Sequence, residues 1–223
     1  MVSLGDLMKA ILEVVLYTVF ALAGIFAINT AYFNTVINSY VVYIILLFII
    51  PIYLLRHSGR SVLASFGLKK NLMLYIYISL LFIICASSIL VYNPSKYQIA
   101  LFSFILVPVA EETAFRGYMV TMLKGLGSTS AFLFSGIAFG LAHLAVDNSF
   151  QSIILRLVIG ILFAYIFFVS GKLLITISLH VLFNVYTILH SIISIQSYIS
   201  ITAALLLALT ALYDYYRERR NAT

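Results

Sequence analysis

Long apolar runs, separated by short polar breaks, follow one another along the whole chain. Each run is about 20 residues long, which at about 1.5 Å per residue is the length that an α-helix needs to cross a bilayer core. The pattern therefore predicts an all-α, polytopic membrane protein with one integral-membrane domain over residues 1–223. We expect about eight transmembrane helices, near residues 7–28, 36–55, 72–92, 97–123, 130–146, 150–169, 173–189 and 197–213.

The connection between the second and third runs has a pattern of its own. It is basic over residues 56–70, and Val62, Leu63, Phe66 and Leu68 recur within it at near-helical spacing. A short helix with apolar side chains on one face and cations beside it is typical of a segment that lies on a membrane surface. We therefore expect such a helix here.

The positive charges predict the orientation, because Lys and Arg concentrate on the cytoplasmic side of membrane proteins. With both termini inside, the outer connections hold only Lys96, while Arg116 and Arg156 lie within the apolar runs. The ten inner cations are Lys9, Arg56, Arg60, Lys69, Lys70, Lys124, Lys172, Arg217, Arg219 and Arg220. This distribution favours an even number of spans with both the N-terminus and the C-terminus inside.

Composition supports a membrane protein and excludes several other classes. The chain is 64% hydrophobic and 9% charged, whereas soluble domains carry about 25% charged residues. The net charge of +6 is explained by the inner connections, so no nucleic-acid partner is expected. Cys85 is the only cysteine, which excludes an internal disulfide and a cysteine-based zinc cluster. We expect a multi-pass protein of the cell membrane, or of an endomembrane in a eukaryote.

Charged residues within the fourth run are the strongest sign of function. An ionisable side chain near the bilayer centre costs roughly 2.5–3.5 kcal/mol even on insertion scales. Such a side chain therefore faces the protein interior, forms an ion pair or belongs to a functional site. Glu112 and Arg116 are four residues apart, which predicts an ion pair on one helix face. Glu111 points about 100° away from Glu112 and should be the free carboxylate.

Polar side chains of two further runs reach the same depth as Glu111. Counted from the inner end of its run at about 1.5 Å per residue, Glu111 lies roughly 18 Å deep, and His143 lies roughly 20–22 Å deep. His180 and Asn184 lie roughly 12–18 Å deep and share one helix face. These counts predict a polar cavity near the middle of the membrane.

Neighbouring residues shape the expected cavity. Phe139 lies one turn before His143 and can form one wall, while Gly136 and Gly140 allow another helix to approach closely. The remaining histidines, His57 and His190, lie in a connection and at an outer helix end.

Each polar residue alone also has a structural explanation. A single intramembrane His is commonly a hydrogen-bonded core residue, a single Asn commonly joins two helices, and a Glu–Arg pair can be purely structural. The arrival of Glu, His, His and Asn from three separate runs at one depth favours a functional site.

The polar residues form three motifs, each with its own spacing: Glu111-Glu112-x-x-x-Arg116, Phe139-x-x-x-His143 and His180-x-x-x-Asn184. In order and spacing they resemble the CAAX protease and bacteriocin-processing family, also called the Rce1-like or Abi family of intramembrane proteases. The resemblance covers roughly residues 95–190. It implies a membrane fold of about eight helices and peptide-bond hydrolysis in a membrane cavity. It further implies that Glu111 and His143 activate the water and that His180 and Asn184 stabilise the oxyanion, with Glu112, Arg116 and Phe139 in support.

Two chemical schemes fit these residues. Amide hydrolysis needs a base for water and donors for the developing oxyanion, which a carboxylate, imidazoles and an amide can supply without a cofactor. Alternatively, Glu111, His143 and His180 could be three ligands of a catalytic zinc ion that keeps a fourth position for water. His-x-x-x-Asn lacks the zincin spacing, which slightly favours the metal-free glutamate scheme. No serine or cysteine nucleophile is evident.

The leading hypothesis is an intramembrane endopeptidase that acts on a peptide or a prenylated CAAX-type protein held in the lipid bilayer. A second hypothesis is a non-catalytic immunity or scaffold protein with the same fold. A third is a proton-coupled transporter, because intramembrane Glu and His also form proton relays. The intact motifs argue against the second hypothesis, and the lack of an internal repeat argues against the third.

Overall fold

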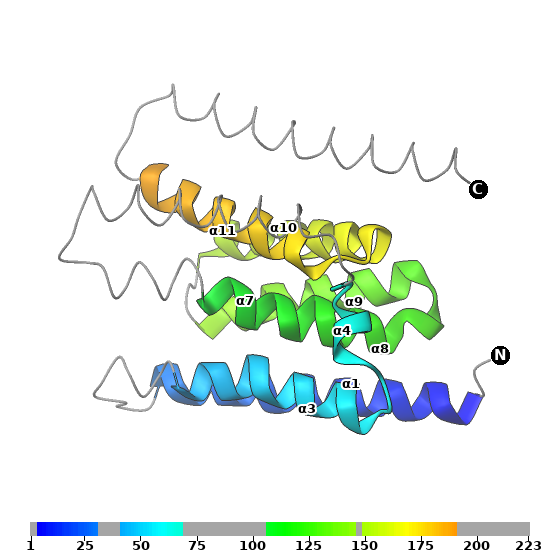
Figure 1. Cartoon of the computed structure of the whole chain (residues 1–223). Coiled ribbons are helices and arrows are strands. Elements are labelled where there is room, and N and C mark those ends of the chain that lie inside the picture. The colour runs from blue at the N-terminus through cyan, green and yellow to red at the C-terminus, as the bar shows by residue number, and fades with distance from the viewer. Residues whose placement is uncertain (1–3, 31–40, 69–105, 146–148, 191–223) are drawn as a thin grey trace, which may run out of the picture.

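The computed structural model describes residues 4–30, 41–68, 106–145 and 149–190. All regular elements in these ranges are helical, as the sequence predicts. The helices run side by side, with α1 and α3 in one layer, α7, α8 and α9 in the middle, and α10 and α11 on the opposite side (Figure 1). The helices expected near residues 72–92 and 197–213 lie outside the described residues.

The first helix, α1 (Leu4–Thr30), is apolar on both of its faces. One face packs into the core through Val14, Tyr17, Ala21 and Ile25. The opposite face leaves Leu16 and Val19 about 60% exposed, at 61% and 62%. A helix that is apolar all round needs an apolar environment on its outer side, as a bilayer provides.

The second helical stretch runs over residues 41–57 and changes its winding midway. A π-helical part, η1 (Ile45–Ile49), precedes α3 (Ile50–His57). The Tyr17 hydroxyl of α1 donates a hydrogen bond to the Leu46 carbonyl at 3.0 Å. This bond ties the two helices together where the backbone departs from α-helical geometry.

The predicted surface helix of the basic connection is only one turn long, α4 (Val62–Ser65), and starts at the N-cap Ser61. Leu63 is exposed, but Phe66 is buried in the core. The Phe66 carbonyl also accepts a hydrogen bond from the Leu173 amide at 3.0 Å. The connection is therefore hydrogen-bonded to the start of α11, while Leu63 on its outer side stays exposed.

The helix that carries the glutamates is irregular. It consists of α7 (Val107–Glu112), the π-helical η4 (Thr113–Val120), α8 (Thr121–Leu123) and the final 3₁₀ turn η5 (Lys124–Leu126). The Ser135 hydroxyl, from a neighbouring helix, donates to the Phe115 carbonyl at 2.6 Å and so supplies a partner for a π-helical carbonyl. Pro108 is buried in the first turn of α7.

The next helix is α9 (Ser128–Ala142), which ends in a 3₁₀ turn, η6 (His143–Ala145). It packs on α10 (Phe150–Ser170), and α11 (Leu173–His190) follows after the left-handed Gly171. A Cβ atom on Gly136 would lie 2.6 Å from the Ile161 Cα atom, so the backbones of α9 and α10 touch. This confirms the predicted close approach of another helix.

Two described helices are long and apolar enough to cross a membrane, Leu4–Ala27 and Phe150–Ser170. Three shorter apolar helices occupy residues 41–57, 128–142 and 173–184. These features agree with a membrane protein. The count of about eight spans, and the inside location of both termini, remain predictions.

Candidate active site

A buried ion pair lies at the centre of the described helices. The Arg116 Nη1 atom lies 3.1 Å from Glu112 Oε1, and both side chains are fully buried, which confirms the predicted pair. Arg116 Nη2 also donates to the Gly160 carbonyl of α10 at 3.1 Å. The guanidinium carbon lies 4.4 Å from the centroid of the Phe139 ring, within cation–π distance.

His180 of α11 lies between the two glutamates. Its Nδ1 atom is 2.9 Å from Glu112 Oε1, and its Nε2 atom is 3.5 Å from Glu111 Oε2. The first contact is a hydrogen bond in which Nδ1–H donates, because a carboxylate oxygen without a proton can only accept. Glu112 therefore joins His180 to Arg116, a link that spacing within one helix did not predict.

Glu111 is not the free carboxylate that helix geometry predicts. The Tyr43 hydroxyl, from the helical stretch before α3, donates a hydrogen bond to Glu111 Oε1. Within the described part of the chain, Glu111 Oε2 is buried and has no hydrogen-bond partner, although it faces His180 Nε2. One oxygen of Glu111 is thus held in place, and the other is left for chemistry.

Tyr43 is the residue at this site that sequence reasoning missed. A signal existed, because Tyr43 lies about 12 residues above the inner end of its run, or roughly 18 Å, at the depth of Glu111. The signal is weak by itself, since the chain contains 16 tyrosines.

His143 lies at the end of α9 rather than inside a continuous helix. Its Nδ1 atom is 2.8 Å from the Phe139 carbonyl oxygen. A carbonyl only accepts, so this contact places a proton on Nδ1 and leaves the lone pair of a neutral ring on Nε2. The Glu111 carboxylate also interacts electrostatically with His143.

The Phe139 ring brings the two imidazoles together. Its centroid lies 4.6 Å from that of His143 and 5.6 Å from that of His180. Residues of η4, η6 and α11 therefore meet around the phenyl ring of Phe139 on α9, as the predicted wall position requires. Asn184 is half-buried one turn beyond His180 on the same helix. His57 is outside this cluster and stacks on Tyr53, with ring centroids 6.0 Å apart.

The three ligands predicted for a zinc ion are not arranged as a metal site. Among the described residues, no group of three His, Cys, Asp or Glu side chains has the spacing to hold a metal ion. The Nδ1 atoms of His143 and His180 both have partners, which leaves Nε2 of each ring as the atom that could bind a metal. The metal-free scheme and the zinc scheme both stay predictions.

These features define a helical membrane protein with a buried carboxylate–imidazole cluster. The family model described as Type II CAAX prenyl endopeptidase Rce1-like matches residues 93–186, which include all three motifs. This part of the chain is similar to an Rce1-like domain, and the similarity points to a protease of the membrane. Comparisons with curated proteins and with solved structures gave no match.

Proposed function

We propose that the chain is an intramembrane endopeptidase of the CAAX type, with a metal-free centre built around Glu111. The observation that carries the proposal is the buried Glu111 Oε2 atom, which lacks a hydrogen-bond partner among the described residues and lies opposite His180 Nε2 at 3.5 Å. A carboxylate held at one oxygen and open at the other is suited to take a proton from water. The Rce1-like match supports the reaction class.

In the first step, Glu111 Oε2 removes a proton from a water molecule, and the resulting hydroxide attacks the carbonyl carbon of the substrate. His143 assists through Nε2, which carries the lone pair when Nδ1–H donates to the Phe139 carbonyl. Tyr43 keeps the Glu111 carboxylate oriented. Holding base and water in one geometry lowers the entropic part of the barrier.

His180 and Asn184 stabilise the oxyanion that forms on the carbonyl oxygen. Glu112 fixes the His180 ring through Nδ1, so that Nε2–H of the protonated ring can donate into the site. Asn184, one turn along α11, supplies an amide donor. Loss of one oxyanion donor typically costs about 100- to 1000-fold in kcat. The C–N bond then breaks, and the leaving amine takes the proton from Glu111.

The substrate in this proposal is a peptide that is held at the bilayer. In the CAAX-type family, an example of such a peptide is a prenylated C-terminal CAAX tail. Binding of the lipid chain would bring the peptide to the depth of Glu111. The bilayer is thus a partner of the protein in addition to its surroundings.

The test is cleavage of a fluorogenic peptide, prenylated or unprenylated, by the purified full-length protein with and without a chelator. We expect prenylated peptide to be cleaved equally well with chelator. Glu111→Gln, His143→Ala and His180→Ala should each lower kcat at least about 100-fold, as expected for groups that act in the transition state. His57→Ala, which removes a histidine outside the cluster, should leave kcat unchanged.

A Glu111→Gln variant that melts like the wild type and cleaves the peptide at the wild-type rate would contradict the role of Glu111 as the general base. Inactivation by the chelator, reversed by added zinc, would replace the metal-free scheme with a metal-dependent one.

A further inference from the structure

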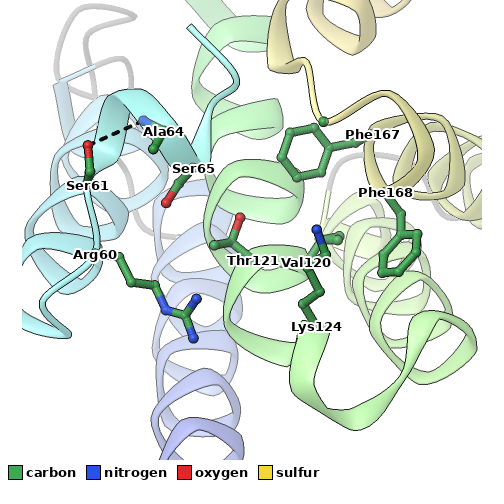
Figure 2. Close-up of a pocket in the computed structure, with 10 residues that line it drawn as sticks. Arg60, Ser61, Ala64, Ser65, Val120, Thr121, Lys124, Phe167 and Phe168 are labelled. Carbon is green, nitrogen blue, oxygen red and sulfur yellow. Dashed lines mark hydrogen bonds between the residues drawn. The ribbon is translucent and has the colours of Figure 1, made fainter. Parts of the chain in front are cut away.

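A pocket lies apart from the cluster of Glu111, Glu112, His143 and His180. It has a volume of about 360 Å³ and is formed by the α3–α4 connection, the end of α8 and the end of α10. Figure 2 shows Arg60 entering from one side and Lys124 from another, with Thr121 between them and the Phe167 and Phe168 rings opposite α4. No residue of the glutamate cluster lines this pocket.

The polar half of the pocket is cationic. Arg60 and Lys124 are exposed, and within the described ranges neither of them forms a salt bridge. The hydroxyls of Ser65 and Thr121 lie on the same lining and can donate hydrogen bonds. An arginine fork, an ammonium group and hydroxyl donors together suit the oxygens of a phosphate group.

The other half of the pocket is apolar and leads onto an apolar strip of α10. Phe167 is buried, and the Lys124 Nζ atom lies 5.4 Å from the centroid of the Phe168 ring. Along α10, Val158, Leu162 and Tyr165 are exposed at intervals of four and three residues, and the strip ends one turn before Phe168. A ligand that uses both halves has an anionic head and an apolar tail.

We infer that this pocket binds the phosphate of an anionic membrane phospholipid, whose acyl chains lie along the exposed strip of α10. The predicted orientation places Arg60 and Lys124 at the inner surface, where anionic headgroups concentrate. A free phosphate ion would satisfy the cations but would make no use of Phe167, Phe168 or the strip. The inference does not depend on the proposed protease activity.

The experiment measures how much lipid the full-length protein retains after purification from nanodiscs of phosphatidylcholine with a minor share of phosphatidylglycerol. Native mass spectrometry counts the bound phosphatidylglycerol. The double variant Arg60→Gln/Lys124→Gln should retain about tenfold less than the wild type, because two charge-assisted contacts are lost. The matched control Lys9→Gln/Arg56→Gln removes two exposed cations outside the pocket and should change retention less than about twofold.

Two further arms identify the ligand. Ala64→Phe fills the pocket without changing any charge, and it should lower retention as the double variant does. Inorganic phosphate, added at millimolar concentration, should not displace the lipid. Equal loss in the control pair would show diffuse attraction and overturn the inference. Displacement by phosphate, or full retention by Ala64→Phe, would overturn it as well.

Discussion

At the scale of single residues, the site depends on how each polar atom is engaged. Glu112 is occupied on one oxygen by both Arg116 and His180, at 3.1 and 2.9 Å. Arg116 is in turn held by the Gly160 carbonyl and by an aromatic face. Within the described residues, Glu111 and Glu112 each keep one buried oxygen without a hydrogen-bond partner, and the Tyr43 hydroxyl holds the other oxygen of Glu111. The division of roles between two adjacent glutamates therefore follows from their different partners.

Tyr43→Phe tests the orientation of Glu111. The substitution removes only the hydroxyl that donates to Glu111 Oε1, so the carboxylate gains rotational freedom while the helix packing is kept. We expect kcat to fall about tenfold, within the range typical of groups that position a catalytic base, with little change in KM. Kinetics with the prenylated fluorogenic peptide measure both constants.

The control for Tyr43→Phe is Tyr53→Phe, which removes a hydroxyl from an exposed tyrosine on α3. This variant should keep wild-type kinetics. Equal loss in both variants would assign the effect to α3 packing instead of the Glu111 contact.

The ion pair could be predicted from the sequence, because Glu112 and Arg116 are four apart on one helix. The approach of Glu111 to His180, and its electrostatic interaction with His143, also agree with the common depth predicted for the three runs. The contacts of Tyr43 and Gly160 were not, since both depend on which helices are neighbours and how they are rotated. The hydrophobic pattern predicts how deep a residue lies along its helix, but it does not predict which residue of a neighbouring helix that residue contacts.

At the scale of elements, both ends of α10 were predicted closely, whereas α9 ends at Ala142 instead of near residue 146. The start of α10 at Phe150 and its end at Ser170 lie within one residue of expectation, because Ser149 caps the helix and Gly171 adopts a left-handed conformation. The π-helical parts η1 and η4 were not foreseen. Their carbonyls are satisfied by side chains of other helices, such as Ser135, and local sequence carries no sign of that.

The contact between α9 and α10 gives a stability prediction. Gly136→Ala would place a Cβ atom 2.5 Å from the Ile161 backbone nitrogen, which cannot move as a flexible side chain can. We expect a loss of about 1–3 kcal/mol in the free energy of unfolding, as for other overpacked sites. Thermal or denaturant unfolding of the purified protein in detergent measures the loss.

Gly125→Ala is the matched control, because its Cβ atom would meet only a Leu7 methyl group at 3.3 Å. It should change stability by less than about 0.5 kcal/mol, as surface substitutions usually do. A Gly136→Ala protein as stable as the control would show that α9 and α10 separate more easily than their backbone contact implies.

At the scale of the whole molecule, sequence and structure agree on a helical membrane protein. The apolar composition was sufficient to predict a membrane protein, because a chain with so few charged residues cannot cover its surface with the polar groups that a soluble protein needs. The helices expected near residues 72–92 and 197–213 lie outside the described residues, so the arrangement of eight spans stays a prediction. The two full-length described helices do not by themselves give the orientation.

Single cysteines test the predicted orientation in a Cys85→Ser background. The start of α9 and the start of α10 lie at opposite ends of a helix hairpin, so Ser128→Cys should be reached only from inside the cell and Ser149→Cys only from outside. A membrane-impermeant thiol reagent, applied to intact and to opened cells, measures the accessibility of each. The reverse labelling pattern would invert the topology.

The shared phenyl ring of Phe139 has a practical consequence. An aromatic ring current shifts the magnetic resonance of nearby protons, and both imidazoles lie within 5.6 Å of this ring, centroid to centroid. Spectra of ¹⁵N-labelled histidine should therefore separate His143 and His180 from the exposed His57. Each imidazole could then be followed individually during substrate addition, with no extrinsic probe in the cavity.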